Sequence, residues 1–261
     1  MTSLAAQAIT SQLAGEEKMQ DYVYLFQPYE VQQILLPETA QSLAVKTFLS
    51  MCGIKYQLEL RTNAEQMSPS GKLPFIKVGQ HIVSEFEPIT DFYAMRGKSL
   101  SEDMVLSQKA EMNSYMSLVI NNLYMAELLI TWHDRETVKE ITRPRYGSPY
   151  PWPLNHILAY SKQWEEYTLL QSAGWTMKSL QQIYEEVDIC CKALSERLDN
   201  QYFFFLDRPT ELDALVFGHV YTLLTTQLIN KKFAEIIEKY DNLIRFCQRI
   251  EKDYFEEKQL P

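Results

Sequence analysis

The stretch Met67–Tyr93, MSPSGKLPFIKVGQHIVSEFEPITDFY, decides the fold of this chain. Its dipeptide Leu73-Pro74 leads into a short β-rich run, and a turn at Gly79-Gln80 brings the chain back as a hairpin. A helical pattern begins shortly afterwards, at about Glu87. A strand pair followed at once by a helix predicts one part of a small α/β unit.

The residues before this stretch supply the rest of that unit. The runs Val23–Phe26 and Val31–Leu36 are rich in β-forming residues, and we predict extended structure for both. Pro37 suits the first turn of a helix, and Gly53 suits its end. Residues 54–60 then alternate in the manner of a half-buried strand. The predicted order is strand, helix, strand, loop, strand, strand, helix.

The pattern changes near residue 97, after which apolar residues recur only at helical spacing. We therefore predict an N-terminal extension over residues 1–20 that is able to form a short helix, an α/β domain over 21–97, and an all-helical domain over 98–261.

Local signals mark where helices of the second domain begin. Residues 99–102, Ser-Leu-Ser-Glu, form a capping-box pattern, in which a side chain satisfies free amides at a helix start. Thr210 and Asp213 form a second such pattern, closed here by an acid. Between them, residues 143–157, RPRYGSPYPWPLNHI, interrupt the helical pattern with prolines and aromatic residues.

Composition excludes several classes of function. The 261 residues carry 25 basic and 34 acidic side chains, a net charge of −9, without a cluster of lysine and arginine. Binding driven by phosphate, as in nucleic-acid recognition, is therefore not expected. The most apolar run, Ala214–Ile229, is broken by polar residues and is too short to span a bilayer. We expect attachment to a membrane to be indirect, through a partner.

Neither the cysteines nor the histidines form a pattern that indicates a metal or catalytic site. Cys52, Cys190, Cys191 and Cys247 lie at apolar positions of helical patterns, which is typical of reduced core thiols. The four histidines are scattered, without a His-x-x-x-His spacing or a pattern that pairs them with carboxylates. We predict no metal, no cofactor and no catalytic residue.

The order of elements resembles the glutathione transferase superfamily, in which a thioredoxin-like domain precedes an all-helical one. Because the proline before the third strand is normally cis there, the resemblance implies a cis bond at Leu73-Pro74. Residues 202–217, YFFFLDRPTELDALVF, resemble the segment in which a Thr/Ser-x-x-Asp box opens a buried helix. Pro74, Thr210 and Asp213 are thereby implied to be structural.

Longer stretches resemble the metaxin family within that superfamily, namely residues 63–79, 146–160 and 209–228. The likeness extends to the last helix, and we expect the branch of the family without a C-terminal anchor. The resemblance implies a peripheral, non-enzymatic subunit on the cytosolic face of the mitochondrial outer membrane. It would pair with metaxin-1 and act with the sorting and assembly machinery, including its β-barrel subunit, on β-barrel precursors.

Glutathione chemistry needs an acid-then-serine pair that holds the γ-glutamyl carboxylate, and a donor near the first strand that stabilises the thiolate. Leu73 and Pro74 border that site, but Phe86 follows Glu85 in place of serine. We expect its ring to close the pocket. Thr39 and Ser42 remain candidate donors, whereas Glu38 would repel a thiolate if it pointed inward. The resemblance thus implies a degenerate glutathione site formed by Thr39, Ser42, Leu73, Pro74, Glu85 and Phe86.

Aromatic residues are the candidates for contact with a partner: Tyr146, Tyr150, Trp152 and Trp175. Prolines stiffen the segment that carries the first three, and rigid aromatic surface suits recognition. Alternatively, this segment is a loop that fills the groove between the domains and buries Trp152. Two other functions stay open, a surviving glutathione-dependent transferase and an adaptor for cargo or motor proteins on mitochondria.

Overall fold

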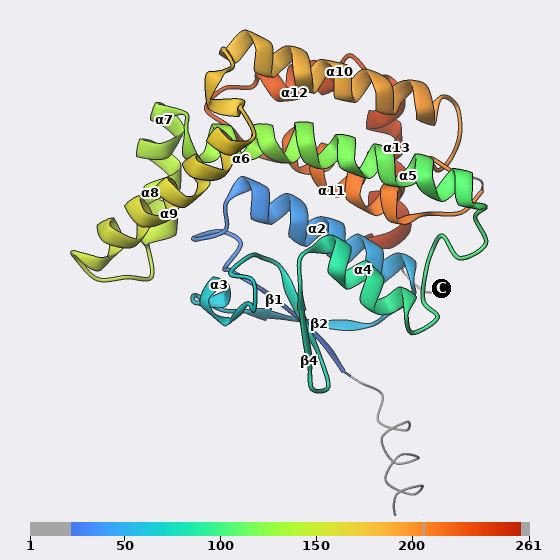
Figure 1. Cartoon of the computed structure of the whole chain (residues 1–261), viewed down its shortest axis with the longest axis horizontal. Coiled ribbons are helices and arrows are strands. Elements are labelled where there is room, and N and C mark those ends of the chain that lie inside the picture. The colour runs from blue at the N-terminus through green and yellow to red at the C-terminus, as the bar shows by residue number, and fades with distance from the viewer. Residues whose placement is uncertain (1–21, 206, 257–261) are drawn as a thin grey trace, which may run out of the picture.

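The computed structural model describes residues 22–205 and 207–256, so the predicted extension over residues 1–20 lies outside the described part. The N-terminal unit pairs its strands in the order β2-β1-β3-β4, with β1 parallel to β2 and antiparallel to β3 (Figure 1). Its elements are β1 (Val23–Gln27), α2 (Leu36–Met51), β2 (Tyr56–Leu60), α3 (Ala64–Met67), β3 (Phe75–Val78), β4 (His81–Ser84) and α4 (Phe86–Ala94).

The two faces of the sheet pack differently because successive side chains of a strand point to opposite sides. Leu25 pairs with Ile76 across β1 and β3, and both belong to the main core beneath α2 and α4. Phe26 and Phe75 point the other way and stack with their ring centroids 4.6 Å apart. Ala64 of α3 covers this smaller cluster.

In the described part, every element after α4 is helical. Short π-helical or 3₁₀ segments follow α5, α7 and α9, which divides the chain into many pieces. The elements are α5 (Leu106–Val119), η1 (Ile120–Tyr124), α6 (Met125–Trp132), α7 (Arg135–Thr137), η2 (Val138–Thr142), α8 (Arg143–Gly147), α9 (Leu154–Ser172), η3 (Trp175–Met177), α10 (Leu180–Leu198), α11 (Glu211–Thr225), α12 (Lys232–Ile237) and α13 (Asp241–Tyr254).

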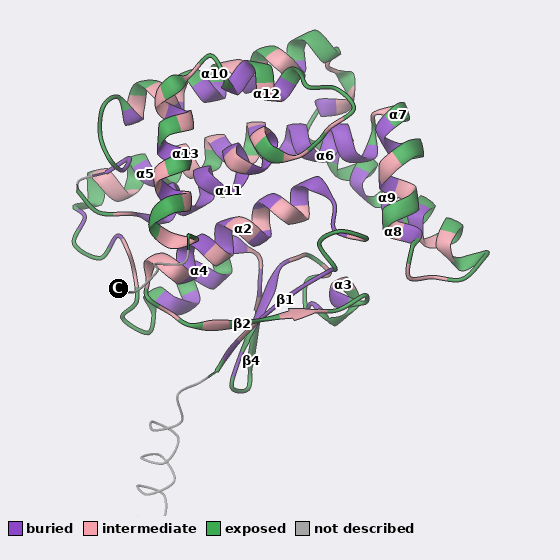
Figure 2. Cartoon of the chain, turned by 180° about the vertical axis from the view of Figure 1, so that it is seen from behind, coloured by how far each residue is buried: buried purple, intermediate pink, exposed green. Residues whose placement is uncertain are grey.

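Helices α2 and α11 join the two units. They lie side by side in both views, and their facing surfaces are buried (Figures 1 and 2). A Cβ atom added to Gly218 of α11 would lie 2.6 Å from the Ala40 carbonyl oxygen and 2.7 Å from the Ala44 Cβ. Glycine is therefore required for the close approach of α11 to α2. This contact also sets the distance between the two units, which enclose the cavity described below.

Several local predictions are confirmed. Pro37 lies in the first turn of α2, and Gly53 follows its end with φ of 67°. The turn of the hairpin has Gly79 at φ of 59°, and the Leu73-Pro74 bond is cis. The Asp213 carboxylate accepts hydrogen bonds from the Thr210 backbone amide and hydroxyl at 2.8 and 2.6 Å, which caps α11 as predicted.

Other local predictions are wrong. Residues 31–36 form a turn that enters α2 rather than a strand, with Val31 exposed and Ile34 buried. No helix begins at Ser99, because α5 starts at Leu106. The Ser99 hydroxyl instead donates to the Glu211 carboxylate at 3.1 Å and so fastens the connection between the units to α11. Residues 143–157 are partly helical, since they contain α8 and the start of α9.

The cysteines are free thiols, and Cys190, Cys191 and Cys247 are buried in the helical unit as predicted, whereas Cys52 is half-buried. Burial raises the pKa of the Cys191 thiol to about 12. Within residues 22–205 and 207–256, none of the helices combines the length and the apolarity that crossing a membrane requires.

Candidate functional site

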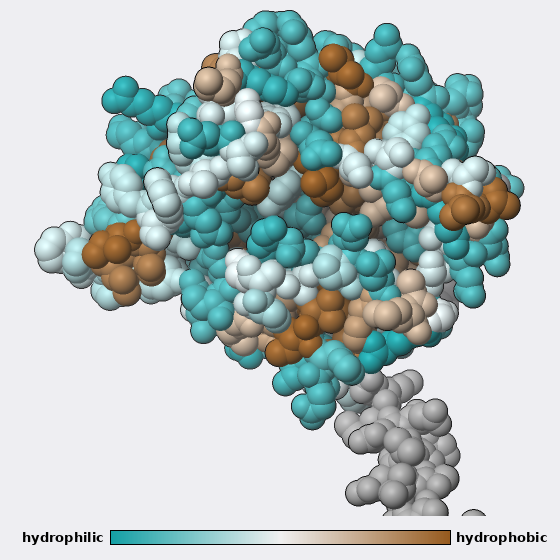
Figure 3. Space-filling model, viewed as in Figure 1, coloured by the Kyte–Doolittle hydropathy of each residue, from teal (hydrophilic) through white to brown (hydrophobic). Residues whose placement is uncertain are grey.

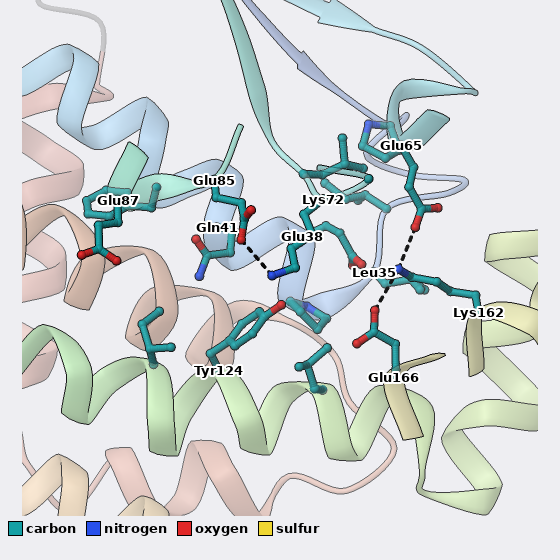
Figure 4. Close-up of a pocket in the computed structure, with 18 of the residues that line it drawn as sticks. Leu35, Glu38, Gln41, Glu65, Lys72, Glu85, Glu87, Tyr124, Lys162 and Glu166 are labelled. Carbon is teal, nitrogen blue, oxygen red and sulfur yellow. Dashed lines mark hydrogen bonds and ion pairs between the residues drawn. The ribbon is translucent and has the colours of Figure 1, made fainter. Parts of the chain in front are cut away.

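A cavity of about 550 Å³ lies between the two units (Figure 4). One side is built by the segments before and within α2 and around β3 and α4. The other side is built by α5, η1, α6 and α9, with Leu215 of α11 between them. The acidic and basic residues that line it are Glu38, Glu65, Lys72, Glu85, Glu87, Lys162 and Glu166.

The first two turns of α2 place two polar side chains in the cavity wall. Glu38 and Gln41 are three residues apart and therefore share one face of the helix. An acid in the first turn is favoured by the positive end of the helix dipole. The Oε2 atom of Glu38 is nevertheless buried without a hydrogen-bond partner.

The loop before β3 and the start of α4 form the adjacent wall. Glu85 is held at φ of 71°, in the left-handed region, and its backbone amide donates to the carbonyl oxygen of Pro74 at 3.0 Å. This unusual backbone conformation turns the side chain toward Lys72, whose Nζ lies 2.9 Å from the Glu85 Oε2. A residue in this conformation is strained, and such residues often lie at binding sites.

A buried lysine connects the opposite wall to the N-terminal unit. Lys162 of α9 has a side chain that is only 8% exposed, and its Nζ lies 2.8 Å from Glu65 and 2.9 Å from Glu166. Tyr146 donates its hydroxyl hydrogen to the other oxygen of Glu65 at 2.8 Å. Glu65 is thus the point in α3 to which two residues of the helical unit bind.

The electrostatics of the cavity are dominated by carboxylates. Burial, with a smaller contribution from the nearby charges of Glu166 and Glu65, raises the pKa of Glu38 to about 7. Burial and Glu166 raise the pKa of Tyr124. Desolvation opposes the charge on Lys162, but Glu166 and Glu65 outweigh it and raise the pKa of that ammonium. Surroundings of this kind favour cations and protonated groups and disfavour a thiolate.

The prediction that Phe86 closes the pocket is wrong. The residue borders the cavity, but its side chain is 4% exposed and packs edge-to-face against Phe48, with the ring centroids 6.2 Å apart. Its ring therefore contributes to the core of the N-terminal unit, and the cavity stays open beside it. The sequence could not indicate this, because the direction of the side chain depends on the strained backbone at Glu85.

The two candidate thiolate donors are not among the residues that line the cavity. Thr39 donates its hydroxyl hydrogen to the Leu35 carbonyl oxygen at 2.8 Å, within its own helix. Ser42 is 1% exposed. Glu38 does face the cavity, which is the arrangement that would repel a thiolate.

Sequence reasoning missed Gln41, Lys72, Tyr124 and the ion pairs of Lys162. One signal was present, because Lys162 and Glu166 are four residues apart on a helix and such pairs meet on one face. The pairing of Lys162 with Glu65 joins residues almost a hundred positions apart, and nothing local indicates it.

The aromatic candidates divide between two locations. Tyr146 and Tyr150 line the cavity, whereas Trp152 is 79% exposed, so the alternative in which Trp152 is buried in the groove is wrong. Trp175 is 4% exposed, so it cannot contribute to a surface for partners. It packs in the main hydrophobic core.

One histidine does pair with a carboxylate, contrary to the sequence prediction. His219 Nδ1 lies 2.9 Å from Glu127 Oε1, and both side chains are fully buried. The two residues are 92 positions apart, which hid the pair. Among the residues that the structure describes, no three histidine, cysteine, aspartate or glutamate side chains gather in a way that could hold a metal ion.

The architecture is that of glutathione transferase-like proteins. A β-etherase from Sphingobium sp. strain SYK-6 matches with a TM-score of 0.59 and 15% identity over 90% of this chain and 99% of that chain. A glutathione transferase family member from Pseudomonas fluorescens, solved with two glutathione bound, matches with a TM-score of 0.58 and 13% identity over 92% of this chain and 93% of that chain. At these identities the likeness establishes the fold alone.

The chain belongs to the metaxin family. It is 54% identical to Metaxin-2 of Homo sapiens over 98% of this chain and 97% of that protein. It is 35% identical to the Metaxin-2 homolog of Caenorhabditis elegans, over 78% and 89% of the two chains, and 30% identical to Metaxin-1 of Mus musculus, over 82% and 69%. Residues 42–163 match a family described as outer mitochondrial membrane transport complex protein, and residues 187–250 match the glutathione S-transferase C-terminal domain.

Proposed function

We propose that this protein is a non-catalytic subunit of a transport complex of the mitochondrial outer membrane. It pairs with metaxin-1, lies peripherally on the cytosolic face, and supports the insertion of β-barrel precursors by the sorting and assembly machinery. Membership of the metaxin family supports this role, as does the match of residues 42–163 to a family of outer-membrane transport complex proteins.

The observation that carries the proposal is an exposed apolar face on α9 and the loop before it. Ile157, Tyr160 and Trp164 lie on one face of the helix and are 58%, 54% and 73% exposed, and Trp152, in the turn before the helix, is also exposed. Apolar side chains gather over the end of the molecule where α8 and α9 lie (Figure 3). Contiguous exposed apolar surface, rich in tryptophan and tyrosine, is typical of protein interfaces.

The chemistry of the cavity supports a non-catalytic role. Glutathione transfer depends on a stabilised thiolate, and here Glu38, Glu65 and Glu166 surround the space that a thiolate would enter. Thr39 has already given its hydroxyl hydrogen to the helix backbone. The protein therefore acts through its surfaces rather than by making bonds.

The partner surface is tested by introducing a charge into it. Trp164→Glu and Ile157→Glu should each reduce co-purification of metaxin-1 from detergent-solubilised membranes by about tenfold or more, the usual effect of losing an interface anchor. Ile189→Glu is the matched control, because Ile189 is also an exposed apolar residue, 61% exposed, but lies on α10. Undiminished co-purification of both α9 variants would exclude this face as the partner surface.

The open cavity keeps a glutathione-dependent transferase as a second candidate. Retention on glutathione-agarose together with a thiol-conjugation assay separates the two functions. We expect neither retention nor turnover. Turnover by the parent protein would establish the transferase and reject the non-catalytic proposal, independently of the result for α9.

A further inference from the structure

The cavity between the units is unaccounted for by a role in protein recognition on α9. We propose that it binds a ligand that carries a primary ammonium or guanidinium group on an apolar stem, such as the side chain of a lysine or arginine. Binding of this ligand is independent of partner binding on the exposed face of α9, so a variant can lose one kind of binding and keep the other.

The charges of the lining indicate the sign of the ligand. Five carboxyl groups face two ammonium groups, and both ammonium groups are already paired. Lys72 binds Glu85, and Lys162 is shared between Glu65 and Glu166. The helix starts at α2 and α4 add positive dipole ends, but each has an acid in its first turn that offsets it. An anion could reach an ammonium group only by displacing a carboxylate from one of these ion pairs. A cation could pair directly with a carboxylate that has no basic partner.

Buried polar atoms that lack a hydrogen-bond partner indicate that the ligand is a hydrogen-bond donor, and they do so independently of the charges of the lining. Among the described residues that line the cavity, the buried polar atoms without a hydrogen-bond partner are Oε2 of Glu38 and Oε1 of Gln33. The Gln33 amide nitrogen donates to the Thr62 carbonyl oxygen at 2.6 Å, which fixes the direction of that amide and leaves its oxygen as the free atom. Both free atoms are acceptors. Buried acceptors are normally satisfied, so a ligand that supplies several N–H donors fits them.

The remaining walls suit an apolar stem. Leu35 and Pro37 from the N-terminal unit face Met116, Ile120 and Leu215 from the helical unit across the cavity. A volume of about 550 Å³ is within the range of small-molecule sites and has room for a side chain with its peptide groups. A cation at the end of a stem of several methylenes therefore reaches Glu38 while its stem stays in contact with apolar side chains.

The test uses the full chain and N-acetyl-lysine amide as the probe, titrated by calorimetry or by chemical-shift changes. We expect saturable binding, and binding about tenfold or more weaker for N-acetyl-norleucine amide, which keeps the stem and lacks the charge. N-acetyl-glutamate amide should not bind. Pentylamine separates the two sources of the ligand. Tighter binding of pentylamine indicates a free amine, and tighter binding of the lysine amide indicates a polypeptide side chain.

Two variants with opposite expected effects locate the binding. Glu38→Gln keeps the shape of the side chain and should weaken the lysine probe by about tenfold, the usual effect of losing a charged hydrogen-bond partner. Lys72→Met removes a competing ammonium group from Glu85 and should tighten it severalfold. Glu235→Gln, on the exposed surface of α12, is the control and should change nothing. Far-UV circular dichroism confirms that each variant is folded.

The proposal is overturned if the lysine and norleucine probes bind equally, if neither binds, or if Lys72→Met weakens binding. Competition by glutathione at lower concentration than the lysine probe would also overturn it, because glutathione carries two carboxylates and its ammonium group lies on no apolar stem. Failure of this proposal would leave the proposed metaxin-1 surface on α9 unaffected.

Discussion

His219 Nδ1 lies 2.9 Å from Glu127 Oε1 in a fully buried pair that ties α11 to α6. On the other side of the imidazole, Nε2 lies 3.1 Å from the Gln41 amide nitrogen of α2. Because an amide nitrogen only donates, His219 Nε2 accepts and Nδ1 carries the proton that it donates to Glu127. One chain of hydrogen bonds therefore connects a wall of the cavity to the contact between the two units.

Breaking this pair should destabilise the whole protein. Glu127→Ala leaves a buried N–H of the neutral His219 without a partner, and we expect the free energy of unfolding to fall by about 1–3 kcal/mol. The double variant with His219→Ala should cost less than the sum of the single variants, with a coupling of about 0.5–3 kcal/mol. Urea denaturation measures all three. The control is Glu185→Ala, on the exposed face of α10, which should change stability by less than about 0.5 kcal/mol. Strict additivity of the Glu127 and His219 variants would show that the pair does not act as a unit.

The contact of α2 with α11 leaves no room for a side chain at Gly218. Gly218→Ala would place its methyl 2.6 Å from the Ala40 carbonyl oxygen and 2.7 Å from backbone and side-chain atoms of Ala44. Backbone cannot move aside cheaply, so we expect a loss of about 1–3 kcal/mol in the free energy of unfolding, although alanine is the better helix former. Thr225→Ala, near the exposed end of the same helix, is the control. A more stable Gly218→Ala variant would contradict the close packing of these helices.

The elements that the sequence predicts correctly are those fixed by neighbours in the chain. Gly53 and Gly79 adopt positive φ where a helix end and a tight turn need it, and Thr210 and Asp213 form a cap within four residues. The predicted strand over Val31–Leu36 fails for a different reason. Val31 is exposed, and Ile34, Leu35 and Leu36 are buried by packing at the start of α2 rather than by pairing with a strand.

The candidate site is predicted less well because its residues meet only in space. Phe86 follows Glu85 in the sequence, but the direction of its ring depends on the backbone conformation of Glu85. Lys162 and Glu65 lie on different units and show no common pattern. The acidity of the cavity depends on these long-range contacts, so the sequence indicated a damaged glutathione site but not a site for cations.

Glu38 should make stability depend on pH in an unusual direction. Its pKa rises from an ordinary value of 4.5 to about 7 in the folded protein, through burial and the charges of Glu166 and Glu65, with Lys162 opposing them. Between these two values the folded state holds more protons than the unfolded state, so stability falls as pH rises. Glu38→Gln cannot ionise, and its stability relative to the parent should increase from pH 5 to pH 8 by up to about 3 kcal/mol. Urea denaturation across this range measures it, and a constant difference would show that Glu38 titrates normally.

The cap of α11 should contribute more to stability than an ordinary helix cap, because it is fully buried. Asp213 accepts from the Phe204 amide at 2.9 Å as well as from the Thr210 amide and hydroxyl, so Asp213→Ala leaves three donors without a partner. We expect a loss of about 2–4 kcal/mol, beyond the range of about 0.5–2 kcal/mol for an exposed cap.

Asp134 offers a matched comparison, since it caps the short helix α7 by accepting from the Thr137 amide and hydroxyl in a half-buried position. Asp134→Ala should cost only about 1 kcal/mol. Thermal unfolding of the two variants beside the parent protein decides the matter. If both caps cost the same, burial does not set the strength of the Asp213 cap, and Phe204 must be held by its aromatic packing alone. The greater cost at Asp213 would instead show that this carboxylate fixes the entry to α11, and with it the close contact of Gly218 with α2 on which the cavity depends.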